Sequence, residues 1–182
     1  MEHRRETHHR RSIRLPEYDY AQPGAYFVTI VTYQHVCIFG KVTHSRVQLS
    51  EIGKIVGATW HEIPTHFPNV TNDHFVVMPN HIHGIIMIED TLVGARHASP
   101  KPIPHDANPR NVNHSALGAI VGSFKSVATK KIHQIKGFEN RPAWQRNYYE
   151  HVIRDEADFK NIVDYIAANP VNWERDPEYL SS

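Results

Sequence analysis

Two histidines separated by one residue, His81 and His83, are the side chains with the clearest capacity for chemistry in this 182-residue sequence. Side chains alternate across a β-strand, so in a strand both imidazoles would point to the same face and could bind one ion. Imidazole is the commonest metal ligand among protein side chains. In a chain with 15 histidines, such a pair also arises from surface residues or from buried histidines with satisfied hydrogen bonds.

A tyrosine and an asparagine near the C-terminus, Tyr165 and Asn169, form a second candidate pair. They are four residues apart, so on a helix they share one face, one turn from each other. The alternatives are ordinary ones: a tyrosine at the edge of a core with its hydroxyl in water, and an asparagine that ends a helix before Pro170. Neither residue is diagnostic alone.

Basic residues gather in three parts of the chain, although the formal net charge is only +1. Arg11 and Arg14 belong to an arginine-rich first segment, and Lys125 belongs to a later group of lysines. Arg146 and Arg154 lie near the last expected strand. Each of these cations could contact a nucleic-acid phosphate, and each could equally belong to a solvated surface.

The spacing of hydrophobic residues predicts the elements that must hold these side chains. Strands are expected at 26–33, 70–77, 81–88 and 144–153, and helices are expected to begin at Ser50, Ser115 and Asp155. The string MPN at 78–80 favours a turn that pairs the second and third strands antiparallel, with His81 at the start of the third. Pro64 and Pro170 are expected to end the first and last helices. This order predicts an α+β protein with helices covering an antiparallel sheet.

Length and composition predict a single domain at 25–182, preceded by a basic arm at 1–24 and containing a mobile loop at 89–114. Hydrophobic residues make up 40% and charged residues 21%, which argues against a disordered or a membrane protein. The single cysteine, Cys37, excludes an intramolecular disulfide. With a charged N-terminus that no apolar segment follows, the sequence predicts a cytoplasmic, nucleoid-associated protein without a membrane partner.

The strings MPNHIHG at 78–84 and YIAANP at 165–170 resemble those of the REP-associated tyrosine transposases, a branch of the single-tyrosine HUH transposases. Similar strings lie at 11–15, 23–29, 124–126 and 144–149, so the resemblance covers most of the chain apart from 89–113. The fold it implies is a ferredoxin-like (RRM-like) antiparallel sheet with helices packed on it, of the HUH endonuclease type.

The resemblance also implies an activity. His81, His83 and Asn169 would bind Mg²⁺ or Mn²⁺, and Tyr165 would attack a phosphodiester of single-stranded DNA that carries hairpin (REP-like) elements. The products would be a 5′-phosphotyrosine and a free 3′-OH. Because the covalent link conserves the energy of the broken bond, the strand can be rejoined elsewhere, which makes such a nuclease a transposase. The protein would act as a monomer or a homodimer.

Two other classes remain open. Cupin metal sites also contain an HxH followed by a glutamate, and Glu89 is available, but cupins are almost entirely β whereas this chain predicts three helices. A catalytically idle relative that binds DNA hairpins without cutting them would have no need to keep His81, His83, Tyr165 and Asn169 together. A nicking assay separates this binding module from the enzyme.

Overall fold

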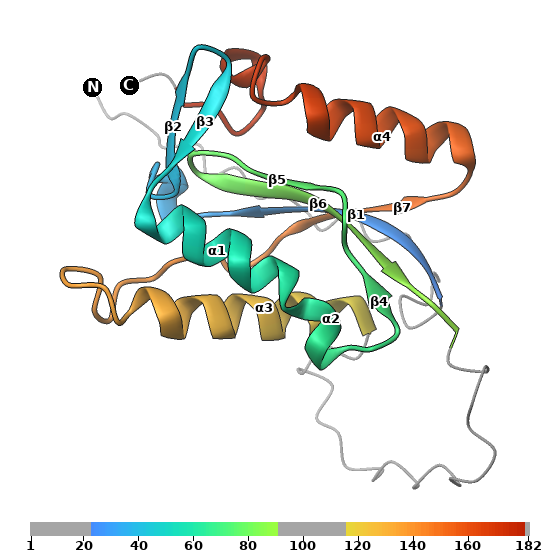
Figure 1. Cartoon of the computed structure of the whole chain (residues 1–182), viewed down its shortest axis with the longest axis horizontal. Coiled ribbons are helices and arrows are strands. Elements are labelled where there is room, and N and C mark those ends of the chain that lie inside the picture. Colours follow the sequence, from blue (N-terminus) through green and yellow to red (C-terminus); the bar gives the residue numbers. More distant parts are fainter. Residues whose placement is uncertain (1–22, 91–115, 181–182) are drawn as a thin grey trace, which may run out of the picture.

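A five-stranded antiparallel sheet with helices on both faces forms the centre of the computed structural model, which describes residues 23–90 and 116–180 (Figure 1). The strands follow the order β4-β6-β1-β7, and β5 pairs with the same side of β6 as β4 does. Their bounds are β1 Gly24–Val31, β4 Val70–Thr71, β5 Phe75–Val77, β6 His81–Ile88 and β7 Tyr149–Ile153. The α+β class is confirmed.

The two central strands, β1 and β6, pair over their full length, from Gly24 opposite Ile88 to Val31 opposite His81. Apart from Thr29, His81 and His83, both are largely apolar on both faces, which is typical of strands covered on each side. On one face, Val28 and Ile82 belong to the larger core beneath α1 (Glu51–His61) and α3 (Ala116–Ile132). On the other face, a smaller core around Phe27 and Ile85 packs against α4 (Glu156–Ala168).

Helices α1 and α4 begin at the predicted N-caps. The Ser50 side chain accepts a hydrogen bond from the Gly53 amide at 3.1 Å, and Asp155 accepts one from the Asp158 amide at 2.8 Å. These side chains satisfy amides that have no partner within their own helix. Helix α4 ends at Ala168, just before the expected stop, so the cap and the proline together set its length.

The chain between β1 and α1 departs from the prediction. It forms a hairpin, β2 (Gly40–Thr43) and β3 (Arg46–Leu49), that stands apart from the main sheet. His44 and Ser45 make its turn with positive φ angles of 51° and 59°. Such turns are usually signalled by Asn-Gly or Asp-Gly, so the sequence carried no sign of this one.

Three other predicted elements differ in extent. The strand expected at 70–77 is divided into β4 and β5. Asn72 lies between these two strands, and its buried side chain donates to the carbonyl of Trp60 on α1. The strand expected at 144–153 is regular only over β7. Pro64 does not end helical structure but lies in the first turn of a short helix, α2 (Ile63–His66), where its missing N–H has no intrahelical role.

Much of the predicted arm and loop falls on residues 1–22 and 91–115, which lie outside the described residues, as does Ser115, the expected start of the helix observed as α3. Gly24, placed in the arm by the prediction, is the first residue of β1. Within the described ranges, no helix is long and apolar enough to cross a membrane.

Candidate active site

Strand β6 presents His81 and His83 on the sheet face that α4 covers. Their ring centroids lie 4.3 Å apart, and the two residues are 0% and 3% exposed. The alternation of a strand therefore does bring the two imidazoles together on one side of the sheet. Their role as metal ligands remains a prediction.

The hydrogen-bond partners of His81 determine where its proton lies. The Asn80 amide nitrogen donates to the backbone carbonyls of Glu178 at 2.8 Å and His35 at 3.3 Å, so the Asn80 amide oxygen faces His81. His81 Nδ1 lies 2.8 Å from that oxygen, which can only accept, so Nδ1 carries the hydrogen. His81 Nε2 is then a buried lone pair with no hydrogen-bond partner among the described residues. Burial, and next the neighbouring His83, lower the pKa of His81 to about 3, so the ring is neutral.

His83 has partners that allow either neutral tautomer. Its Nε2 lies 3.2 Å from Oδ2 of Asp176, to which it donates, since a carboxylate can only accept. Its Nδ1 lies 2.9 Å from the hydroxyl of Thr29, the residue opposite it on β1. A hydroxyl can both donate and accept, so Thr29 would also support the tautomer in which Nε2 offers its lone pair to a cation.

Helix α4 brings the second predicted pair to the same place. Tyr165 Oη lies 3.2 Å from His83 Nε2 and donates to Asp176 Oδ2 at 3.1 Å. The Asn169 amide nitrogen donates to Asp176 Oδ2 at 2.8 Å, and its buried Oδ1 has no hydrogen-bond partner in the described part of the chain. Tyr165 itself is 40% exposed, so its hydroxyl sits at the border between the buried cluster and solvent.

Asp176 is the site residue that sequence reasoning missed. A short 3-10 helix at Trp173–Arg175 turns the chain back after α4 and delivers Asp176 to the histidines. Its Oδ1 accepts from the Glu178 amide at 2.7 Å, and its Oδ2 lies 3.9 Å from His81 Nε2. Burial raises the pKa of this carboxyl, but hydrogen bonds from His83 and Asn169 outweigh burial and hold it below its usual range. In the sequence, Asp176 is an acidic residue in a polar tail, and no spacing rule connects it to the histidines.

The arrangement fits a divalent cation. Ligand atoms of His81, His83 and Asp176 all lie within 4.8 Å of one another, and all three residues are buried. The unpartnered His81 Nε2 and Asn169 Oδ1 are the kind of atoms that need a partner, because a buried polar atom without one costs about 1–3 kcal/mol. Imidazole nitrogens, a carboxylate and an amide oxygen are donors that divalent metal ions accept in proteins.

Tyr165 is a neutral phenol in this arrangement. Its partial burial, and next the carboxylate of Asp176, raise its pKa above the ordinary value. Both effects disfavour a negative charge on Oη. Chemistry at this oxygen therefore requires either a compensating positive charge nearby or removal of the proton as a new bond forms.

An exposed aromatic residue, Tyr149, lies beside the cluster. It contacts the buried Phe27, with ring centroids 6.3 Å apart. The Phe27 ring in turn stacks on His83 at 5.4 Å and meets Tyr165 at 6.0 Å. Tyr149 is 37% exposed and lies opposite Thr29 on the site face of the sheet. Trp144, by contrast, is a buried core residue.

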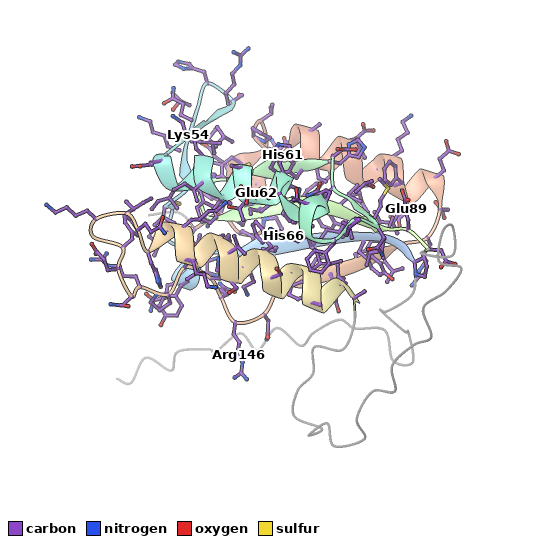
Figure 2. All side chains as sticks on the ribbon, turned by 60° about the horizontal axis from the view of Figure 1, so that its bottom comes forward. Lys54, His61, Glu62, His66, Glu89 and Arg146 are labelled. Carbon is purple, nitrogen blue, oxygen red and sulfur yellow. The ribbon has the colours of Figure 1, made fainter. Side chains whose placement is uncertain are left out.

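The predicted DNA-binding cations are not part of this cluster. Lys125 lies on α3, across the sheet from α4, and its ammonium donates to the carbonyls of Gln145 at 2.6 Å and Arg146 at 3.2 Å. Burial lowers the pKa of Lys125 to about 8. The exposed Arg146 side chain extends away from the ribbon below α3 (Figure 2). Arg154 is exposed at the end of β7, and Arg11 and Arg14 lie outside the described residues. DNA contacts by these five residues remain predictions.

Comparisons with known proteins place the chain in a family. No protein-family model matches it. An uncharacterized protein of Haemophilus influenzae is 42% identical to it over 173 residues, which cover 95% of this chain and 94% of that protein. The chain belongs to the same family as that protein. A second H. influenzae protein, provisionally named a REP-associated tyrosine transposase, is 23% identical over 159 residues, or 84% of this chain and 73% of its own.

A solved structure has the same fold. The structure of a REP-associated tyrosine transposase bound to a REP hairpin superimposes with a TM-score of 0.57 at 18% sequence identity, covering 87% of this chain and 74% of its own. This likeness confirms the expected architecture, an antiparallel sheet with helices packed on it.

Proposed function

We propose that this protein is a metal-dependent DNA transposase that nicks and rejoins single-stranded DNA near hairpins through a 5′-phosphotyrosine on Tyr165. The observation that carries the proposal is the position of Tyr165 Oη, 3.2 Å from His83 Nε2 and 3.1 Å from Asp176 Oδ2. A core-edge tyrosine needs no such neighbours. The likeness to a transposase bound to a REP hairpin supports the choice of substrate.

His81, His83 and Asp176 would hold the cation, with Asn169 Oδ1 available as a further ligand. When bound, an Mg²⁺ or Mn²⁺ ion supplies positive charge that polarises a phosphate oxygen and favours the phenolate over the phenol. This charge would offset the burial and the carboxylate that raise the pKa of Tyr165. The unpartnered His81 Nε2 and Asn169 Oδ1 would gain a partner in the same event.

The side chains themselves would carry the reaction. Tyr165 Oη forms a bond to phosphorus while the bond from phosphorus to the 3′ oxygen breaks. The phenol proton passes to solvent as the new bond forms, and the 3′ oxygen takes up a proton from solvent to become a free hydroxyl. In the reverse direction, a different 3′-OH attacks the phosphotyrosine, which restores the phenol and joins the two strands. Because Tyr165 is partly exposed, the strand would approach Oη from the exposed side of the ring.

The test is adduct formation on end-labelled single-stranded DNA that contains a REP-like hairpin, in Mn²⁺ and in Mg²⁺, followed by denaturing electrophoresis. We expect a covalent adduct with the wild-type protein and none with Tyr165→Phe or His83→Ala, whose folding circular dichroism would verify. Tyr149→Phe, which alters an exposed tyrosine beside the site, should retain the adduct. Hairpin binding by the wild-type protein with no cleavage in either metal would instead identify the binding module and refute the transposase.

A further inference from the structure

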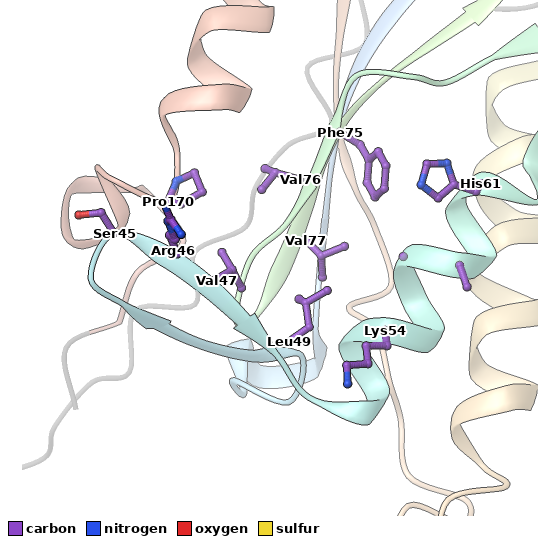
Figure 3. Close-up of a pocket in the computed structure, with 12 residues that line it drawn as sticks. Ser45, Arg46, Val47, Leu49, Lys54, His61, Phe75, Val76, Val77 and Pro170 are labelled. Atoms are coloured by element: carbon purple, nitrogen blue, oxygen red, sulfur yellow. The ribbon is translucent and has the colours of Figure 1, made fainter.

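A groove of about 580 Å³ lies along the outer edge of β5, outside the candidate active site (Figure 3). The β2–β3 hairpin and α1 form its walls, and Pro170, two residues after the end of α4, lies at one end. Its lining includes Val47 and Leu49 of the hairpin and Val76 and Val77 of β5. The groove is therefore an apolar trough between β5 on one side and the consecutive β2–β3 hairpin and α1 on the other.

Two cations border this trough. Arg46 and Lys54 contribute to its lining and are exposed, as is His61, and no aspartate or glutamate lines it. Within the described residues, neither Arg46 nor Lys54 forms an ion pair with a carboxylate. At the α1 end, the rings of His61 and Phe75 meet edge-to-face, with centroids 4.8 Å apart (Figure 3). An apolar floor with an aromatic pair and unpaired cations suits a ligand that is flat and apolar in one part and anionic in another.

The groove is adjacent to the candidate active site. Val76 lies directly opposite His83 in the pairing of β5 with β6, one strand away, or about 4.8 Å in the direction of the hydrogen bonds. Pro170 follows Asn169, whose amide donates to the carboxylate that binds Tyr165. A DNA strand whose phosphate reached Tyr165 would pass around the edge of β5 to reach the part of the groove beside Phe75, which lies on the opposite face of the sheet.

We propose that this groove binds a nucleotide that flanks the scissile phosphate of single-stranded DNA. The base lies on the apolar floor beside Phe75 and His61, and Arg46 and Lys54 contact the phosphates. This inference rests on the proposed function, because the occupant is the same DNA strand. The charge of the rim favours this occupant over an apolar peptide or an apolar surface of a second copy of the chain, either of which would leave the cations uncompensated in an interface.

Photo-crosslinking tests the site without requiring cleavage. The protein carries Tyr165→Phe, and the hairpin oligonucleotide carries one 5-iododeoxyuridine at successive positions on either side of the cleavage position. We expect one or two neighbouring positions, and no distant ones, to crosslink to a peptide that contains Phe75 or His61. Crosslinks confined to other surfaces would overturn the proposal.

Binding measurements give the matched controls. Removing both cations with Arg46→Ala and Lys54→Ala should lower the slope of log affinity against log salt by about 1.4, since each phosphate contact of a single strand contributes about 0.7. Lys41→Ala, an exposed cation of the same hairpin outside the lining, should leave the slope unchanged. Ala58→Trp fills the groove and should weaken binding roughly tenfold, which lies within the range for losing one stacked base.

Gly57→Ala is the control for the filled groove, because its added Cβ would meet Val77 Cγ2 at an ordinary 3.8 Å. Groove crosslinks without any covalent adduct from the wild-type protein would support the groove and refute the proposed chemistry. Normal adduct formation by the wild-type protein, with unchanged DNA binding in the Arg46, Lys54 and Ala58 variants, would support the proposed chemistry and refute the groove. A dimer that Ala58→Trp dissociates, with DNA affinity unchanged, would assign the groove to a second copy and also overturn the proposal.

Discussion

Tyr165→Phe separates a nucleophile from a structural tyrosine, because it removes only the hydroxyl. The ring would keep its contacts with Phe27 and His83, at centroid distances of 6.0 Å and 5.1 Å. A hydrogen bond to a charged group contributes about 1.5–3 kcal/mol, but water can replace it at a residue 40% exposed. Asp176 also keeps its bonds from Asn169 and His83. We therefore expect the free energy of unfolding to fall by about 1 kcal/mol at most, while the covalent adduct disappears completely.

The measurement combines denaturant unfolding with adduct yield on the same preparations. Tyr33→Phe is the control, since Tyr33 is similarly exposed, at 44%, and lies outside the site. It should change neither quantity. Full adduct yield in Tyr165→Phe would refute the role of Tyr165 as nucleophile. A loss of about 3 kcal/mol or more would show that the hydroxyl is mainly structural, because that exceeds the range for one hydrogen bond to a charged group.

Three further outcomes follow from the surroundings of single residues. The pKa of His81 falls from 6.5 to about 3 on folding, so between these pH values the unfolded chain binds one proton more than the folded protein. The free energy of unfolding without added metal should therefore decrease as the pH falls from 6.5 to 3, by on the order of 4 kcal/mol. Chemical denaturation across this range measures the decrease, and His81→Gln should flatten it. Gly84→Ala would place a Cβ 2.4 Å from the ring of the fully buried Trp60 and should lower the free energy of unfolding by about 2 kcal/mol or more. Gly122→Ala, whose added Cβ would have nothing within 4 Å, should raise it by about 0.5–1 kcal/mol. Thermal melting that failed to rank the two variants this way would contradict the packing. Lys125→Met leaves two carbonyls without their donor and should cost about 1–3 kcal/mol, while a reduced salt slope of DNA binding would show that this lysine also contacts phosphates and an unchanged slope would limit it to a structural role.

Features that depend on a few neighbouring residues could be predicted from the sequence. Alternation in a strand places His81 and His83 on one face, and a four-residue spacing in a helix does the same for Tyr165 and Asn169. The caps at Ser50 and Asp155, and most of the elements between them, follow from equally local rules of hydrogen bonding and periodicity. Such rules hold wherever the segment lies in the molecule, so no tertiary structure is needed to apply them.

The assembly of the candidate site was decided by packing between distant segments. The larger core on one face of the sheet accommodates α1 and α3, and α4 covers the other face, which carries the histidines. Only this arrangement brings Tyr165 Oη within 3.2 Å of His83. Asp176 reaches the cluster because the chain turns back after α4 and Asn80 anchors the Glu178 carbonyl, a bond between residues 98 positions apart. The β2–β3 hairpin, and with it the groove beside β5, likewise has no local signal. Long-range contacts of this kind are selected by the total burial of apolar surface and the pairing of buried polar atoms, quantities that belong to the whole fold and to no single segment.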